Sequence, residues 1–375
     1  MYKNKIIHII TSLNDGGAEG VLTRLIINSP KHTLHEVVCL GGSNKYGNIL
    51  NKNNIKVHIL NMKLWSMNIS KIIYLHKLLN KKKNFTVQTW LYHADFLGGI
   101  LAKISGIKNI IWNIRTSEIN FQTYKFTTFL IILACAILSW FIPSKIIICS
   151  KRSMTIHSKI GYKNIFHLIQ NGFQLKKSNK KKILELKKKL SIKEAFVIGN
   201  VSRYHPQKNH FFLLECFQKF IKKNSNSILV LVGSNLDKKN KELQEKIKTL
   251  NLKDRVVLLG QRDDINDIYQ LFDFFILPSS SEGFPNVLAE AMLNKIPCCS
   301  SDVGDAKEIL GNDGWIISST NHSKTINVLN KAYKMKSNQK LWNNRKNRCR
   351  ERILKRFPLK KMIFSYSKIW SLCKA

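Results

Sequence analysis

The segment "DFFILPSSSEGFPNVLAEAML" (273–293) joins an apolar run to a helix-forming run through a short polar loop. The continuous apolar run at its start is typical of a strand buried on both faces of a parallel sheet. Pro285 suits the first turn of a helix, and "NVLAEAML" contains strong helix formers. The segment therefore predicts one β-α unit, with Glu282 on the loop and Glu290 in the second turn of the helix.

The same alternation of strands and helices runs through most of the chain. The first half predicts strands at 5–12, 35–40, 56–60, 85–91, 109–115 and 145–150, with a helix at 18–29. After a lysine-rich break at 171–192, further strands are expected at 195–203, 227–233, 255–260, 272–279, 296–301 and 314–318. Such a pattern favours parallel sheets covered by helices on both faces.

The length of 375 residues agrees with two domains, because single cores stop growing at roughly 250–300 residues. We expect an N-terminal domain at 1–172 and a C-terminal domain at 173–355. The tail, 356–375, predicts a helix that begins near Pro358.

The chain is strongly basic, with 62 Lys and Arg against 23 Asp and Glu, a formal charge of +39. These residues are dispersed along the sequence. Composition bias accounts for part of the charge. As a functional feature, it indicates a partner rich in phosphate: nucleic acid, an anionic membrane surface or a phosphorylated substrate.

Eight cysteines lack metal-type spacing, and most lie in apolar runs, where cysteine behaves as a small hydrophobe. The vicinal pair Cys298 and Cys299 is not expected to form a disulfide. The N-terminus lacks a signal-peptide cleavage pattern. Together these features predict a protein of the reducing cytoplasm.

The segment "FTTFLIILACAILSWFIPS" (126–144) is the most apolar of the chain. Its core, Phe129 to Ile142, is shorter than the roughly 20 residues that a spanning helix needs. We expect a helix that Pro143 ends, either buried or in contact with a membrane interface, and weigh a spanning helix as the lesser alternative.

"SLNDGGAEGVL" (12–22) places Gly16 and Gly17 between the first strand and the first helix. Glycines there let backbone approach a ligand, and the helix N-terminus attracts anions; a plain tight turn is the alternative. The segment does not match G-x-G-x-x-G, and the second strand ends in Leu40-Gly41-Gly42 without an acid. Both features weigh against a nicotinamide dinucleotide site.

"VSRYHPQKNH" (201–210) follows the first strand of the second half. Arg203 and Lys208 lie on a loop at the carboxyl end of that strand, where ligands of open α/β sheets bind. A planar guanidinium and a point charge suit a diphosphate, and solvated side chains are the alternative. Asn209 is expected to cap the next helix.

The helix after Pro285 offers a further phosphate site. We expect unpaired N–H groups at Asn286, Val287 and Leu288, where an anion can accept them. Glu282 and Glu290 then need not touch each other, because they can hold opposite ends of one ligand. A structural turn remains the alternative.

These stretches, in this order, resemble retaining glycosyltransferases of family 4, the group 1 glycosyltransferases with an E-x7-E motif. Glu282-Gly283-Phe284-Pro285-Asn286 with Glu290 resembles the motif, and Gly16-Gly17 the family's first loop. The resemblance covers most of the chain. It implies the GT-B fold, an α/β architecture of two Rossmann-like domains facing across a cleft, with a C-terminal helix crossing back to the first domain.

The resemblance also implies roles for residues. Glu290 would bind the ribose, Arg203 and Lys208 the diphosphate, and Glu282 the donor sugar, as a positioning group or a nucleophile. His93, in "TWLYHADFLGG" (89–99), matches a histidine near the donor sugar, and Arg115 is an acceptor or phosphate candidate. The nucleotide-sugar site would be completed by Gly16, Gly17, Arg262, Gly283, Phe284, Pro285, Asn286, Val287 and Leu288.

The implied activity is transfer of a sugar from a nucleotide-sugar donor, a UDP-sugar by expectation, to a lipid-linked glycan in cell-surface polysaccharide biosynthesis. No D-x-D sequence is present, so we expect neither a metal nor another cofactor. We expect peripheral binding to the anionic inner face of the cell membrane and no nucleic-acid partner. The alternatives are a basic nucleic-acid-binding or non-catalytic protein, and an epimerase or sugar phosphorylase on a similar fold.

Overall fold

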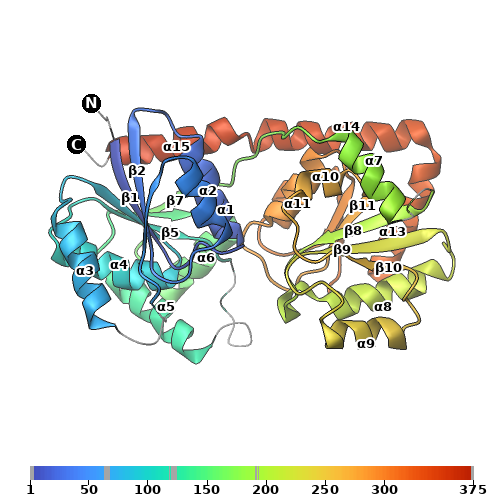
Figure 1. Cartoon of the computed structure of the whole chain (residues 1–375), viewed down its shortest axis with the longest axis horizontal. Helices are drawn as coiled ribbons and strands as arrows, with labels where there is room; N and C mark the ends of the chain where they lie inside the picture. The colour runs from blue at the N-terminus through green and yellow to red at the C-terminus, as the bar shows by residue number, and fades with distance from the viewer. Residues whose placement is uncertain are drawn as a thin grey trace. The chain divides into compact units, whose positions relative to one another are not determined.

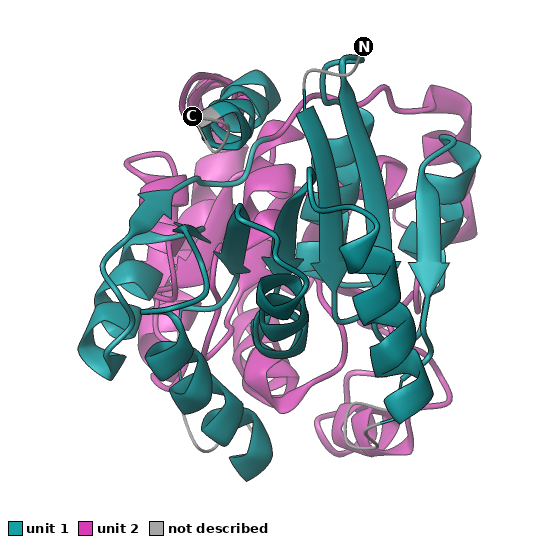
Figure 2. Ribbon diagram, turned by 90° about the vertical axis from the view of Figure 1, so that its left-hand side faces the viewer, with its two compact units in different colours: residues 1–172, 359–375 teal, residues 173–358 magenta. Residues whose placement is uncertain are grey.

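The computed structural model describes residues 4–62, 68–117, 119, 125–190, 192 and 194–372. It divides the chain into two compact units (Figure 2). Unit 1 holds residues 1–172 together with 359–375, and unit 2 holds residues 173–358.

Unit 1 is built on a seven-stranded sheet in which every pairing is parallel, with the order β3-β2-β1-β4-β5-β6-β7. The strands are β1 (Asn4–Ile10), β2 (Thr33–Cys39), β3 (Lys56–Ile59), β4 (Thr86–Trp90), β5 (Ile110–Ile114), β6 (Lys145–Ile148) and β7 (Phe166–Leu168). The helices are α1 (Gly17–Ile27), α2 (Lys45–Lys52), α3 (Ile69–Asn80), α4 (Tyr92–Ile104), α5 (Phe126–Leu138), α6 (Lys151–Ile160) and α15 (Leu359–Leu372).

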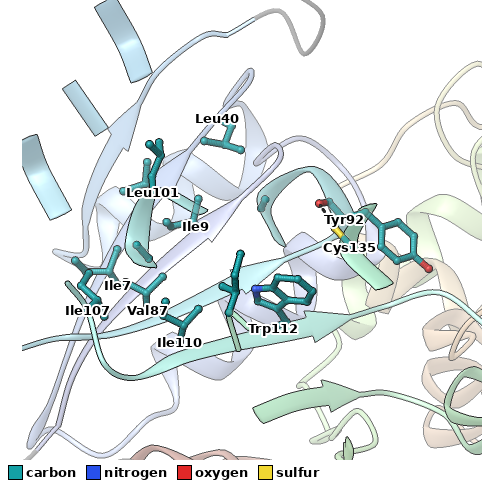
Figure 3. Packing of buried hydrophobic residues seen from close by; sticks show 14 of the residues in the cluster. Ile7, Ile9, Leu40, Val87, Tyr92, Leu101, Ile107, Ile110, Trp112 and Cys135 are labelled. Carbon is teal, nitrogen blue, oxygen red and sulfur yellow. Dashed lines mark hydrogen bonds between the residues drawn. The ribbon is translucent and has the colours of Figure 1, made fainter. Parts of the chain in front are cut away.

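The two faces of this sheet carry separate cores. On one face, α3, α4 and α5 cover strand residues such as Ile9, Val87 and Trp112 (Figures 1 and 3). The Cys135 thiol of α5 donates to the carbonyl of Tyr92, which ties α5 to the start of α4 (Figure 3). On the other face, α1 and α15 pack over alternate strand residues. Both faces are therefore apolar, which explains the unbroken apolar runs of these strands.

Unit 2 is a six-stranded parallel sheet with the order β10-β9-β8-β11-β12-β13. The strands are β8 (Phe196–Val201), β9 (Ser227–Val232), β10 (Val256–Leu258), β11 (Phe274–Leu277), β12 (Cys298–Ser301) and β13 (Trp315–Ile317). The helices are α7 (Lys180–Lys189), a 3₁₀ turn η1 (Pro206–Lys208), α8 (His210–Ile221), α9 (Lys241–Thr249), α10 (Ile265–Tyr269), α11 (Asn286–Leu293), α12 (Ala306–Leu310), α13 (His322–Ser337) and α14 (Gln339–Arg356).

The apolar segment at 126–144 forms a shorter helix than the sequence predicts. The helix α5 ends at Leu138, five residues before Pro143. The buried hydroxyl of Ser139 donates to the carbonyl of Ala136 at 2.6 Å and accepts the N–H of Lys163 at 2.8 Å. These bonds hold the turn that follows the helix, so Pro143 is not what ends it. In the part of the chain that the structure describes, no helix has the length and apolarity needed to cross a bilayer.

The C-terminal helix begins next to Pro358, as the sequence predicts. Arg356 is the last residue of α14, and Phe357 packs its ring 5.5 Å from that of Phe284 in unit 2. The helix α15 then begins at Leu359 and packs in unit 1, where the indole of Trp370 donates to Gln88 at 2.7 Å. The return of this helix to the N-terminal domain is thus confirmed.

The cysteines take the buried positions expected of small apolar side chains. Cys298 and Cys299 lie in β12, are fully buried and form no disulfide. All seven cysteines within the described residues are buried, and none of them is disulfide-bonded. Cys373 lies outside the described residues.

Candidate active site

The strand order reverses once in each sheet, and most of the candidate residues lie on the segments that follow the strands at that point. In unit 2, the neighbours β8 and β11 are followed by the loops 202–209 and 278–285. In unit 1, the neighbours β1 and β4 are followed by the loop with Gly16 and by the start of α4. Open α/β sheets bind ligands outside the carboxyl ends of their strands at such a reversal.

The loop after β8 is held by the segment that follows β9. The N–H of Tyr204 donates to the carbonyl of Ser234 at 2.8 Å. Gly233 makes this approach possible, because its φ is +147° and a Cβ there would lie 1.8 Å from the Ser202 carbonyl oxygen. The backbone fixes the loop, and the side chain of Arg203 is exposed on it.

The loop after β11 is bonded to the loop after β8. The N–H of Ser280 donates to the carbonyl of Gln207, and the amide of Gln207 donates to the carbonyl of Ser281, both at 2.9 Å. Lys208 and Glu282 form an ion pair, with Nζ and Oε1 2.5 Å apart. The same Oε1 accepts the hydroxyl of Ser279 at 2.8 Å. The sequence placed Lys208 and Glu282 in one site, and the structure brings their charged groups together.

A close backbone approach fixes the turn at Gly283. The N–H of Asp305 donates to the carbonyl of Gly283 at 3.2 Å. Gly304 has a φ of +51°, and a Cβ on it would lie 2.0 Å from that same oxygen. Phe284 is buried and stacks 6.1 Å from the ring of Phe173. The motif loop is therefore anchored on both sides of its glycine.

The start of α11 differs from the prediction in two details. Pro285 precedes the helix as its N-cap residue and does not lie in the first turn. The N–H of Leu288 donates to the carbonyl of Pro285 at 3.1 Å, so it is not an open donor. A tight first turn closes this bond, and the expected anion site loses that N–H. Asn286 and Val287 open the helix as expected.

Glu290 lies in the second turn of α11 and is partly buried. The hydroxyl of Tyr269 lies 3.3 Å from Glu290 Oε2 and 3.3 Å from the carbonyl of Val287, so its single proton can serve either. Burial raises the pKa of Tyr269 well above its usual range, so this phenol stays a donor.

The loop after β8 is electropositive. Burial lowers the pKa of His205, and the charges of Arg203 and Lys208 lower it further. The pKa of His210 falls to about 4 through burial, with Lys208 as the second cause. Within the described part of the chain, no acidic group forms an ion pair with Arg203. The two histidines are thus neutral at pH 7, and an anion near this loop would meet two cations.

Asn209 does not cap α8 through its side chain. Its φ is +57°, and its amide donates to the carbonyl of Ser319 at 2.7 Å. A left-handed residue cannot turn its side chain onto the helix N–H groups in the usual cap geometry, in which the residue is extended. Asn209 instead ties the loop to the segment after β13.

Arg262 is engaged by a neighbouring carboxylate. Its guanidinium donates two bonds to Asp264, at 2.9 and 2.7 Å. This fork, with Lys182 nearby, lowers the pKa of Asp264 to about 2. Arg262 follows β10, which β9 and β8 separate from β11 in the sheet. A ligand would have to compete with Asp264 for its guanidinium.

In unit 1, Gly16 is the N-cap residue of α1 and Gly17 the first residue of the helix. The carboxylate of Glu19 folds back toward the loop and accepts the hydroxyl of Ser12 at 2.8 Å. A Cβ on Gly16 would lie 2.3 Å from that carboxylate. The first glycine is needed for this close contact.

His93 lies at the start of α4, next to a strained residue. Leu91 has φ +74° and ψ 153°, a region that only glycine enters freely. Burial lowers the pKa of His93, so its imidazole is neutral at pH 7. Two residues further, Asp95 is fully buried and accepts the hydroxyl of Thr89 at 2.5 Å. Backbone strain at a sheet reversal is a mark of a functional site.

Arg115 follows β5, and its guanidinium is held inside unit 1. It donates to Asn171 and lies 5.7 Å from the ring of Trp90. Asn171 belongs to the "NGF" stretch that ends the first domain in the sequence. Arg115 is therefore a partly buried cation with a defined orientation.

Three residues of the site were not singled out from the sequence. Gln207 joins the two loops, Ser279 binds Glu282, and Tyr269 faces Glu290. Ser279 directly follows a buried strand at the reversal point, so its position in the sequence could have predicted that it belongs to the site. The partners of Gln207 and Tyr269 depend on tertiary packing, which residue spacing alone does not reveal.

Comparison with known proteins places this arrangement in a family. The family described as "Glycosyl transferases group 1" matches residues 162–352, half of the chain. An Escherichia coli protein, UDP-Gal:alpha-D-GlcNAc-diphosphoundecaprenol alpha-1,3-galactosyltransferase, is 29% identical over 318 residues, which cover 78% of this chain and 76% of the relative.

A second relative is the Staphylococcus aureus capsular polysaccharide biosynthesis glycosyltransferase CapH. It is 24% identical over 311 residues, which cover 81% of this chain and 83% of the relative. Among solved structures, Anabaena Alr3699/HepE in complex with UDP-glucose superposes with a TM-score of 0.84 at 21% identity, over 98% of this chain and 99% of that one.

The two Rossmann-like units form the GT-B fold. The chain belongs to the group 1 glycosyl transferases, as its motifs indicated. Of the two relatives, one is named for transfer to a diphosphoundecaprenol-linked sugar and the other for capsular polysaccharide biosynthesis. The prediction of a glycosyltransferase is thereby confirmed.

Proposed function

We propose that the protein transfers a sugar from a UDP-sugar to a lipid-linked glycan, with retention of the anomeric configuration. The ion pair of Lys208 with Glu282 at the strand reversal of unit 2 carries this proposal. The side chains are 16% and 13% exposed, so both are partly desolvated and still accessible to a ligand. The E. coli relative, named for a UDP-Gal donor and a diphosphoundecaprenol acceptor, supports the choice of donor and acceptor.

The diphosphate of the donor would be bound by Lys208, Arg203 and the N-terminus of α11. A lysine has three N–H donors, so Lys208 can keep Glu282 and still hold a phosphate oxygen. Arg203 adds a planar fork that suits a phosphate. The positive N-terminal end of α11 adds partial charge. These groups would neutralise the departing diphosphate, and we propose that no metal or other cofactor takes part.

The two glutamates would bind the neutral ends of the donor. Glu290 would accept the ribose hydroxyls, with Tyr269 orienting its carboxylate. Glu282 would accept hydroxyls of the donor sugar and stabilise positive charge at its anomeric carbon. Gly283 and Phe284, held by Asp305 and Phe173, would fix the position of the loop that carries Glu282.

The transfer would proceed on one face of the sugar. The bond from the anomeric carbon to the phosphate oxygen breaks, and the acceptor hydroxyl oxygen bonds to the same carbon on the same face. The hydroxyl proton passes to the departing phosphate, which leaves as UDP. This route needs no covalent intermediate, so Glu282 is proposed as a positioning group. By the family resemblance, His93 is proposed to contact the donor sugar and Arg115 the acceptor.

The basic charge of the chain supports a peripheral association with the anionic inner face of the cell membrane, where a lipid-linked acceptor would be found. The test is an assay with radiolabelled UDP-sugars and a membrane extract. Lys208→Ala should reduce transfer by about 10²–10³-fold, the effect expected when one donor to a developing anion is lost. Full activity in this variant would rule out the assigned site.

A further inference from the structure

One face of unit 1 carries a continuous apolar stripe. Along α5 and the turn after it, the side chains at positions 126, 130, 133, 137, 140 and 141 are exposed. The spacing of four, three, four and three residues places them along one side of the helix. Ile137 and Phe141 are 68% and 70% exposed. The opposite side of α5 is buried through Ile132, Cys135 and Ala136.

The helix α5 is thus apolar on both sides, while the protein covers only one. A helix that is apolar all round is normally buried in a core or in a membrane. Its 13 residues extend over about 20 Å, too short for a hydrocarbon core of about 30 Å. The exposed side can instead lie flat against a bilayer interface.

The surroundings of the stripe are basic. From residue 119 to residue 184 the sequence contains no Asp or Glu. The four helices of this face, α3 to α6, hold one acidic residue, Asp95, and it is fully buried. Between residues 125 and 172 there are six basic residues: Lys125, Lys145, Lys151, Arg152, Lys159 and Lys163. This charge complements an anionic lipid surface.

The end of the stripe has the composition of a membrane interface. Trp140 and Phe141 follow the helix, and the Trp140 indole donates to the carbonyl of Gly161 at 3.0 Å. Together with Leu133, Ile137 and Ile160, they line an open apolar hollow. Lys159 and Lys163 flank Ile160 and Gly161 in the sequence. Aromatic rings beside lysines favour the headgroup level of a bilayer.

We infer that this face, the α5 stripe with its basic rim, is the surface by which the protein docks on an anionic bilayer. The inference rests on the proposed lipid-linked acceptor and assigns the membrane contact to named residues. The apolar side chains enter the headgroup boundary, and the lysines remain with the lipid phosphates. An apolar surface in a segment that carries basic residues and no acidic ones fits an anionic bilayer better than a second copy of this chain, because two such faces would repel each other.

The test is co-sedimentation of the full chain with vesicles at physiological salt, where charges further apart than about 8 Å are screened. Vesicles of phosphatidylcholine alone are compared with vesicles containing an equal part of phosphatidylglycerol. We expect binding to the mixed vesicles, and a loss of about tenfold or more in Ile137→Ser/Phe141→Ser, which removes two inserting side chains. The matched control is Leu341→Ser/Phe364→Ser, two exposed residues of α14 and α15, with no change expected.

Three further measurements distinguish the possible causes of a loss of vesicle binding. Circular dichroism must show the variants folded, which their exposure favours. A change of oligomeric state in Ile137→Ser/Phe141→Ser without vesicles would assign the face to a second copy and overturn the inference, as would unchanged vesicle binding. UDP binding, read by thermal shift, is expected to survive in this variant. Vesicle binding without UDP binding would contradict the proposed function alone, and UDP binding without vesicle binding would contradict this inference alone.

Discussion

Lys208 connects the two loops that meet at the strand reversal of unit 2. Its ammonium lies 2.5 Å from Glu282, and Glu282 also receives the hydroxyl of Ser279. A charge held in place before a ligand arrives costs no reorganisation during the reaction. Glu282, paired with Lys208, and Glu290, beside Tyr269, are therefore expected to have different roles.

Glu282→Gln and Glu290→Gln are expected to impair different steps, catalysis and UDP binding respectively. Glu282→Gln removes the negative charge beside the donor sugar, so kcat should fall while the Kd for UDP changes little. Glu290→Gln weakens a charge-assisted bond to the ribose, so the Kd for UDP should rise by about tenfold or more. Steady-state kinetics and calorimetric titration of UDP distinguish the two. Equal effects of both variants on UDP binding would contradict the division of roles.

Leu91 tests the strain next to His93. At an ordinary position glycine is less stable than alanine by about 0.5–1 kcal/mol. At φ +74° and ψ 153° the order should reverse, with Leu91→Gly about 1–2 kcal/mol more stable than Leu91→Ala. Urea unfolding of the two variants measures the difference. The usual order, alanine above glycine, would mean that the backbone here is unstrained.

At the element scale, α15 is a structural part of unit 1. Trp370 is fully buried, and the side-chain amide of Asn113 donates to the hydroxyl of Tyr366 at 2.9 Å. The helix closes the core over α1 and β1, with Leu359, Met362 and Ile369 buried beside them. A chain that ends before Leu359 would expose this core.

Trp370→Ala should lower the free energy of unfolding of unit 1 by about 3–5 kcal/mol, the usual cost of removing a buried aromatic side chain. The control is Phe364→Ala on the same helix. Phe364 is exposed, so its loss should cost no more than about 0.5 kcal/mol. Thermal unfolding of both variants measures the contrast. Similar losses would mean that α15 does not pack in solution as described.

Local patterns predicted the elements well where apolar runs are long. The strands near 85–91, 109–115 and 227–233 and the position of Glu290 in the second turn of α11 follow from sequence alone. The end of α5 and the role of Asn209 did not. Both depend on bonds to distant segments, from Ser139 to Lys163 and from Asn209 to Ser319, which no local pattern contains.

At the scale of the whole molecule, buried histidines predict how stability depends on pH. The pKa values of His35, His157 and His210 lie at about 4, against an ordinary 6.5, and that of His8 is also lowered well below it. Between about pH 4 and 6.5 the unfolded chain therefore binds more protons than the folded one. Stability is fully present above pH 6.5 and is lost as the pH falls toward 4.

Asp95 opposes this trend, because burial raises its pKa to about 7 and the folded state keeps its proton. Because four histidines outweigh one acid, the free energy of unfolding still falls as the pH falls. Each additional proton bound by the unfolded chain contributes about 1.4 kcal/mol per pH unit. The melting temperature should fall clearly from pH 7 to pH 5. The variant His35→Asn retains a polar atom near His8, and its melting temperature should fall less steeply over this pH range. An unchanged melting temperature would contradict the burial of these rings.

The division into two α/β units and the candidate loops were predictable from the order of motifs. Arg203, Lys208, Glu282 and Glu290 all follow or flank strands at the reversal of unit 2. The sequence did not predict the internal partners, such as Asp264 for Arg262 or Pro285 for the N–H of Leu288. Those pairings depend on backbone geometry that is fixed only after the loops pack.

The most direct measurement of the central claim is single-turnover transfer from a radiolabelled UDP-sugar to a lipid-linked glycan, in wild type, Lys208→Ala and the control Lys340→Ala. Lys340 is exposed on α14, outside the site. We expect labelled glycolipid with wild type and Lys340→Ala, and a rate lower by about 10²–10³-fold with Lys208→Ala. Equal rates in all three proteins would contradict the assignment of the diphosphate site to the loops after β8 and β11.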